Sequence, residues 1–168
     1  RSTAETRVSH SNQDGVTSVM TSSPGEILGS EYSFTKIFDN DTTSSPATHH
    51  LNLFHSSAVY TNNGIYKNNG SAPSTNGYTG MWVQQNYSSP ICFTRFNLHP
   101  RHNQLEMTPK NFKVFVGNNG TTWEELYEYI GGVNEPVEGN DNVIEENFTG
   151  IVADTPYTFI RFVFNSVY

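Results

Sequence analysis

The feature that most constrains the fold of this chain is the lack of a long amphipathic helical pattern. Only the stretch TWEELYEYI near Trp123 has the apolar spacing of a helix, and it predicts a single helical turn. The other patterned segments are short β-type runs separated by clusters of Asn, Ser, Thr and Gly. In chain order these runs are GVTSVM, YSFTKIF, MWVQQNY, ICFTRFNL, NFKVFVG, NVIEENF and YTFIRFVFNSVY. We therefore expect an all-β fold.

Two of these runs indicate how the strands pack. In NFKVFVG, Phe112, Val114 and Val116 share one face, because side chains alternate along a strand. The dipeptide Asn119-Gly120 then predicts a turn. The run from Phe159 to Phe164 is apolar on both faces, interrupted by Arg161, so it is expected to be covered on each side. Several such strands without helices predict an antiparallel β-sandwich or jelly roll.

Composition narrows the class of protein. The chain has 168 residues, 35% of them hydrophobic and 15% charged, which fits one compact domain with a hydrophobic core. Its formal charge of −7 argues against nucleic acid as a partner, since phosphates are bound mainly by Lys and Arg. No apolar run approaches the length of about 20 residues that a transmembrane helix needs, and no signal peptide is visible. The abrupt start, RSTAETR, fits a mature fragment or an excised piece of a longer chain.

Cysteines and sequons add little. Cys92 is the only cysteine, so an intrachain disulfide is excluded, and its apolar neighbours in ICFTRF predict a buried, inert thiol. Asn-X-Ser/Thr sequons begin at five asparagines, which are Asn40, Asn69, Asn86, Asn119 and Asn147. Chance alone gives about four in a chain this rich in Asn, Ser and Thr, so their number says almost nothing about secretion.

The segment from Asp39 to Gly80 is rich in loop residues and poor in apolar ones. Loops of this length in a compact domain are usually functional or disordered. Tyr60, Tyr66 and Tyr78 lie within it, where an aromatic ring offers a flat apolar face edged by a hydroxyl.

Four motifs follow one another between Ser22 and Phe164, and they carry a resemblance to a known family. They are FTKIFDND, GMWVQQNYSSPICFTRFNLHPR, NFKVFVGNNGTTWEEL and YTFIRFVF. Their order and spacing resemble the discoidin, or coagulation-factor type C, family and its sugar-binding, galactose-binding-like relatives. The resemblance implies an antiparallel β-sandwich (a galactose-binding-like jelly roll) with long loops at one end. It implies a single domain over residues 1–168, with residues 1–15 as an N-terminal extension.

The chain departs from the family pattern in three places. The family's Trp after the Asp loop is replaced by SSPATHH, and the paired cysteines of the clotting-factor branch are absent. The second departure favours the bacterial or viral-type sugar-binding branch. The chain also stops at Tyr168, before the family's final strand, so either its end is clipped or its sandwich closes differently.

The resemblance implies a sugar site around HPRHN. Arg101 matches an arginine that, in the sugar-binding relatives, donates hydrogen bonds to sugar hydroxyls, a role that suits the fixed donors of a guanidinium. The alternative is a solvated turn whose arginine pairs with a nearby carboxylate. The other candidate ligand-binding residues are His99, His102, Asn103, His50, His55 and Tyr78.

Metal sites are considered for two groups of residues. Asp39, Asp41 and Ser44 lie in a loop that resembles the family's structural calcium site, and DNDTTSS offers the oxygen ligands that Ca²⁺ prefers. The alternative is a polar turn that needs no ion. A zinc site is disfavoured, because His99 and His102 face opposite sides of an extended strand and no cysteine accompanies them.

Two further expectations concern packing and function. The resemblance implies that Trp82 and Trp123 are packed in the core. No nucleophile elbow, phosphate-binding glycine loop or His-Glu-x-x-His helix occurs, and no pattern brings two glutamates together as a glycosidase requires, so the chain is not predicted to be an enzyme.

The expected function is that of a non-catalytic, lectin-like module. It would recognise glycans, of galactose type in the relatives, through loops at one end, in an extracellular or surface-exposed setting (secreted, cell-surface or virion). Its parent would be oligomeric or multidomain. The alternatives are an adhesion or attachment domain that binds a protein receptor, and a jelly roll that serves assembly alone.

Overall fold

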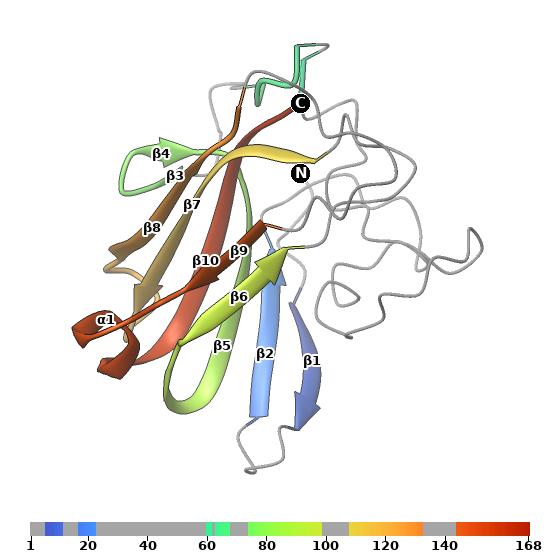
Figure 1. Cartoon of the computed structure of the whole chain (residues 1–168). Helices are drawn as coiled ribbons and strands as arrows, with labels where there is room; N and C mark the ends of the chain where they lie inside the picture. The colour runs from blue at the N-terminus through green and yellow to red at the C-terminus, as the bar shows by residue number, and fades with distance from the viewer. Residues whose placement is uncertain are drawn as a thin grey trace, which may run out of the picture.

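The computed structural model describes residues 6–11, 17–22, 60–61, 63–67, 74–98, 108–132 and 144–168, and it consists almost wholly of β-strands (Figure 1). In chain order the strands are β1 (Thr6–Ser11), β2 (Thr17–Ser22), β3 (Ser74–Thr75), β4 (Tyr78–Thr79), β5 (Met81–Cys92), β6 (Arg95–Leu98), β7 (Pro109–Gly117), β8 (Glu124–Ile130), β9 (Ile144–Asn147) and β10 (Pro156–Val167). One short helix, α1 (Ile151–Asp154), precedes β10.

Six strands form the main sheet in the order β1-β2-β5-β10-β7-β8. All neighbouring strands in it are antiparallel, and β10 lies between β5 and β7. The second layer is the antiparallel pair β6–β9, which crosses one face of the main sheet (Figure 1). The predicted antiparallel β-sandwich is therefore confirmed, with the run from Phe159 to Phe164 in a central strand as expected.

The hydrophobic core lies between the main sheet and the β6–β9 pair. Phe112, Val114 and Val116 are each 0% exposed and share the inner face of β7, as strand alternation predicted. Phe162 of β10 packs beside them, and Phe96 of β6 meets it edge-on with ring centroids 5.3 Å apart. Edge-on aromatic contacts of this kind add to the area burial that stabilises the sandwich.

The opposite, outer face of the main sheet is also partly covered. Phe115 of β7 and Val163 of β10 are on this face and are almost fully buried. The β3–β4 hairpin lies over it, with the ring of Tyr78 centred 6.5 Å from that of Phe115. Asn76 and Gly77 both have positive φ, as a tight two-residue hairpin turn requires.

The stretch TWEELYEYI does not form the predicted helical turn. It forms β8, which pairs with β7 and places Tyr127 and Tyr129 opposite Val114 and Phe112. The ring of Tyr129 stacks on that of Phe112 at 5.1 Å. Pairing with the buried β7 strand outweighs the weak local helical pattern, because the strand also packs the two half-buried tyrosine rings against the core.

Two other expectations concern the first part of the chain. Thr6–Ser11 forms β1 and pairs with β2, so this part of the expected extension 1–15 belongs to the main sheet. The predicted strand YSFTKIF lies outside the described residues.

Candidate functional site

The sandwich has two ends with different kinds of connection. At the upper end in Figure 1, β2, β6, β8 and β10 finish and β5, β7 and β9 begin, as the strand pairings require. At the lower end, the connections that the structure describes are short: residues 93–94, 118–123 and 148–155. The longer segments 99–107 and 133–143 each leave and re-enter the sandwich at the upper end, and the segment that follows β2 leaves from there too.

All but one of the predicted site residues belong to these upper-end segments. His99, Arg101, His102 and Asn103 follow Leu98, the last residue of β6. His50, His55, Asp39, Asp41 and Ser44 come after β2 and before Tyr60. All nine lie outside the described residues, so their roles stay predictions, and the structure places only the strands that lead into and out of them.

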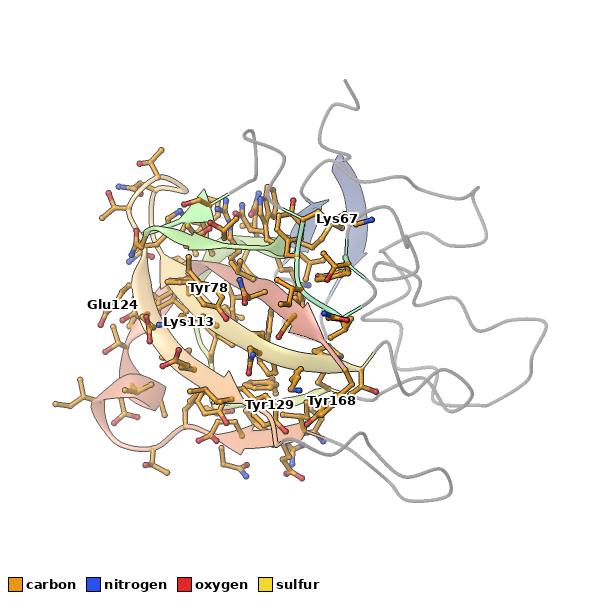
Figure 2. The ribbon with its side chains drawn as sticks, turned by 90° about the horizontal axis from the view of Figure 1, so that it is seen from above. Lys67, Tyr78, Lys113, Glu124, Tyr129 and Tyr168 are labelled. Carbon is orange, nitrogen blue, oxygen red and sulfur yellow. The ribbon has the colours of Figure 1, made fainter. Side chains whose placement is uncertain are left out.

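Tyr78 is the predicted ligand-binding residue that the structure does describe. It lies in β4 on the outer face, where the ammonium of Lys113 is 5.2 Å from the centre of its ring (Figure 2). Burial, followed by the nearby carboxylate of Glu128, raises the pKa of the Tyr78 phenol to about 12. Its hydroxyl is therefore neutral, and able to donate a hydrogen bond, at any physiological pH.

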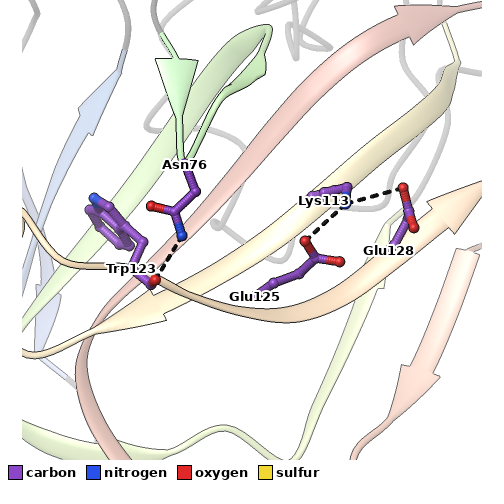
Figure 3. Close-up of polar contacts among 5 residues, drawn as sticks. All are labelled: Asn76, Lys113, Trp123, Glu125 and Glu128. Carbon is purple, nitrogen blue, oxygen red and sulfur yellow. Dashed lines mark hydrogen bonds and ion pairs between the residues drawn. The ribbon is translucent and has the colours of Figure 1, made fainter.

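The ammonium of Lys113 forms ion pairs with two glutamates, which no sequence pattern had brought together at one site. Its Nζ lies 2.8 Å from Glu125 and 3.3 Å from Glu128, both of which come from β8 (Figure 3). The hydrogen bond to Glu125 is the main cause that raises the pKa of Lys113. One ammonium shared by two half-exposed carboxylates is an ion-pair network on the outer face, worth about 1 kcal/mol or less for each pair.

The most elaborate polar cluster of the described residues surrounds Arg161 of β10. Its guanidinium lies between two indole rings, 4.3 Å from the centre of Trp82 and 4.1 Å from the centre of Trp123. In the plane of the guanidinium, Nε donates to Gln84 at 2.8 Å and Nη1 to Thr75 at 2.8 Å, while Nη2 donates to the same Gln84 oxygen. Burial lowers the pKa of Arg161 to about 10, which still leaves it charged at neutral pH.

This cluster joins three strands and the residue that precedes a fourth. Arg161 comes from β10, Trp82 and Gln84 from β5, Thr75 from β3, and Trp123 immediately precedes β8. The side chain of Asn76 adds a bond from the β3–β4 turn to the carbonyl oxygen of Trp123 at 2.7 Å (Figure 3). This arrangement can hold the β3–β4 hairpin against the main sheet. Within it, Arg161 already has Gln84 and Thr75 as hydrogen-bond acceptors.

The positions of Trp82 and Trp123 correct an expectation. Both were predicted to be packed in the core, but both are half-buried on the outer face. Strand alternation explains this for Trp82, whose neighbour Val83 takes the inner face. The sequence feature that could have predicted these positions is the arginine within an apolar strand, because a partly buried guanidinium needs flat aromatic or planar polar partners.

Cys92 was predicted to be buried and is exposed. It is the last residue of β5 at the lower end, where the chain turns towards β6, and its Sγ donates to the carbonyl oxygen of Asp154 at 3.5 Å. The apolar neighbours that motivated the prediction do not cover it: Cys92 still pairs with Pro156, but β5 ends here and Ile91 and Phe93 are themselves only half-buried.

In the ranges that the structure describes, no three His, Cys, Asp or Glu side chains lie close enough to bind a metal ion together. The only helix in those ranges, α1, is too short to cross a membrane.

Comparison with known proteins identifies the family. The F5/8 type C domain, which is the discoidin family, matches residues 40–167. The chain belongs to this family. The matched range includes all the predicted ligand-binding residues, from His50 to Asn103. Domains of this family are typically non-catalytic binding modules and are generally extracellular or on surfaces.

Among the solved structures that are similar to this chain is a mutant of the lectin binding domain of Lectinolysin complexed with Lewis b. It shares 16% sequence identity with a TM-score of 0.36, over 53% of this chain and 59% of that chain. No match was found among curated proteins.

Proposed function

We propose that this protein is a non-catalytic carbohydrate-binding module that recognises glycans through the upper-end segments. The observation that supports this most is topological: the segments that hold Arg101 and the histidines attach to the same end of one sandwich. Because the strand order attaches these segments to one end, we propose that residues about 50 positions apart in the chain contact a single ligand.

The chemistry of the candidate residues supports a sugar rather than a charged polymer. Arg101 offers fixed N–H donors, and His99, His102 and Asn103 offer donors and acceptors that match hydroxyl groups. A site of this kind binds weakly by itself, so we propose that its parent is a multidomain or oligomeric protein that gains avidity. We also propose an extracellular or surface location.

The decisive experiment is a glycan-array measurement followed by competition with free galactose-type sugars. For Arg101→Ala we expect binding about 10- to 100-fold weaker, the range for losing hydrogen bonds from a charged group. Arg95→Ala is the matched control, since Arg95 is an exposed arginine of β6 at the lower end and its loss should leave binding unchanged. Full glycan binding by Arg101→Ala would refute the site, and a protein that binds no glycan but adheres to a protein receptor would favour the attachment-domain alternative.

We also propose that Asp39, Asp41 and Ser44 hold a structural calcium ion. Their carboxylate and hydroxyl oxygens are of the type that Ca²⁺ prefers. A bound ion stabilises the folded state, so a calcium chelator is expected to lower the melting temperature of the wild-type protein. The variant Asp41→Asn should start lower and respond less to the chelator. A melting temperature that the chelator leaves unchanged removes calcium from the proposal.

A further inference from the structure

The sequons of this chain become informative once they are located in the fold. Three of the five, at Asn86, Asn119 and Asn147, lie in the described residues. Their number matches chance, but their environments differ sharply.

Asn119 lies at the exposed tip of the β7–β8 hairpin. Its side-chain oxygen accepts hydrogen bonds from the backbone N–H of Thr121 at 3.0 Å and from the Thr121 hydroxyl at 3.1 Å. The asparagine and the threonine that define the sequon therefore lie together on a turn where both are exposed.

Asn147 is the exposed last residue of β9. The residue after it, Phe148, packs against Phe96 and Tyr127 with ring centroids 6.0 and 6.3 Å apart. Because alternate residues face opposite sides, burial of Phe148 leaves Asn147 and Thr149 on the outside. Both side chains of this sequon are accessible without any change in the core.

Asn86 is placed very differently. It lies in the middle of β5, between Val19 of β2 and Phe159 of β10. It is half-buried, and its side-chain oxygen accepts a hydrogen bond of 2.6 Å from Gln84, the residue that holds Arg161. A bulky substituent at this position would have to fit against the face of a six-stranded sheet.

We propose that Asn119 and Asn147 are N-glycan acceptor sites and that Asn86 is not. The proposal requires the secretory passage of an extracellular protein in a eukaryotic cell. There the asparagine Nδ2 forms a bond to the anomeric carbon of an oligosaccharide carried on a polyprenyl pyrophosphate. The bond from that carbon to the pyrophosphate oxygen breaks, the carrier leaves as its pyrophosphate, and the amide nitrogen gives up one proton.

Asn119 and Asn147 both lie at the lower end of the sandwich. Asn119 is on the β7–β8 turn and Asn147 leads into α1, whose Ile151 is 85% exposed and Val152 40% exposed. A hydrophilic glycan on Asn147 would lie beside this apolar pair, which otherwise faces water. Both glycans would leave the upper end uncovered, where the proposed ligand segments attach.

The test is to secrete the chain from a eukaryotic cell behind a cleavable signal peptide. Peptide-N-glycosidase treatment in oxygen-18 water then marks each formerly glycosylated asparagine as a labelled aspartate, which peptide mass spectrometry assigns individually. We expect the label at Asn119 and Asn147 and none at Asn86. Asn40 and Asn69 lie outside the described residues. Their peptides are measured separately and count neither for nor against the proposal.

Matched variants separate glycosylation from folding. Thr121→Val and Thr149→Val keep each asparagine but remove the sequon hydroxyl, so each is expected to lose one glycan while secretion continues. Ser88→Ala removes the sequon of Asn86 and should leave the glycan count unchanged. Secreted protein that is unlabelled at Asn119 or Asn147, or labelled at Asn86, would overturn the proposal. This readout is independent of whether the upper end binds a sugar.

Discussion

Arg161 is a charged residue in β10, a central strand of the main sheet, and its neighbours explain how it is tolerated. Two indole rings cover the faces of its guanidinium, and Gln84 and Thr75 accept its N–H groups. Each cation–π contact is worth about 0.5–2 kcal/mol, depending on how far the cation is removed from water. The cluster offsets the cost of partial burial and links β10 to β5, β3 and the start of β8.

We expect Arg161→Ala to lower the free energy of unfolding by about 2–4 kcal/mol. The variant loses both ring contacts and leaves Gln84 and Thr75 without their partner. Arg161→Lys should be intermediate, because one ammonium cannot replace a planar group that is stacked on both sides. Urea unfolding measures the difference.

The control for this prediction is Arg95→Ala, since Arg95 is a strand arginine that is exposed. Its expected effect is within about 0.5 kcal/mol. If Arg161→Ala and Arg95→Ala had equal stabilities, the cluster would have no role in holding the sheet.

Among the elements, the β3–β4 hairpin depends on a close approach of two backbones. Gly80 joins β4 to β5, and a Cβ on it would collide with the carbonyl oxygen of Phe164 in β10. The side chain of Asn165 also donates to the carbonyl oxygen of Thr79 at 2.8 Å. Only glycine allows the hairpin to fold back over the outer face at this distance.

Gly80→Ala is therefore expected to destabilise the protein by about 1–3 kcal/mol, because backbone atoms rather than a flexible side chain must move. The matched control is Gly132→Ala, since a Cβ at Gly132 meets no atom within 4 Å. Thermal and urea unfolding of both variants check this. A Gly80→Ala protein as stable as Gly132→Ala would show that the hairpin is not held in this position.

For the whole molecule, tyrosine burial couples stability to alkaline pH. In the described residues, burial is the first cause that raises the phenol pKa at Tyr60, Tyr66, Tyr78, Tyr87, Tyr127, Tyr157 and Tyr168. For Tyr78 and Tyr87 the pKa reaches about 12. The chain carries a formal net charge of −7 at neutral pH, so further ionisation adds to its self-repulsion.

The raised phenol pKa values determine how the free energy of unfolding changes with pH. A folded pKa above the unfolded value of about 10 means that the folded state holds the proton more tightly. The corresponding stability is complete below pH 10 and is lost as the pH rises from about 10 to about 12. We expect the urea midpoint to fall across this range and tyrosinate absorbance to rise later than in the unfolded chain.

Tyr87→Phe tests this coupling, because it removes a phenol whose pKa burial raises to about 12. The variant should lose less stability than the wild type between pH 10 and pH 12. An identical pH dependence in both proteins would contradict the assignment.

The sequence by itself determined the features that depend on local pattern and motif order. Alternation in NFKVFVG placed Phe112, Val114 and Val116 in the core, and the two-sided apolar run identified β10 as a covered strand. The order of the motifs indicated the discoidin family, which the match over residues 40–167 bears out. The strand features could be predicted because side chains alternate along any β-strand, whichever strand it pairs with.

Only the tertiary structure decided which strands are neighbours, and with that several side-chain environments. Pairing with β7 turned TWEELYEYI into a strand, Cys92 is exposed at the end of β5, and Trp82 and Trp123 lie against Arg161 on the outer face. The common end of the upper segments is also a result of strand order. These outcomes rest on contacts between residues far apart in the chain, which a local period of two or 3.6 residues cannot encode.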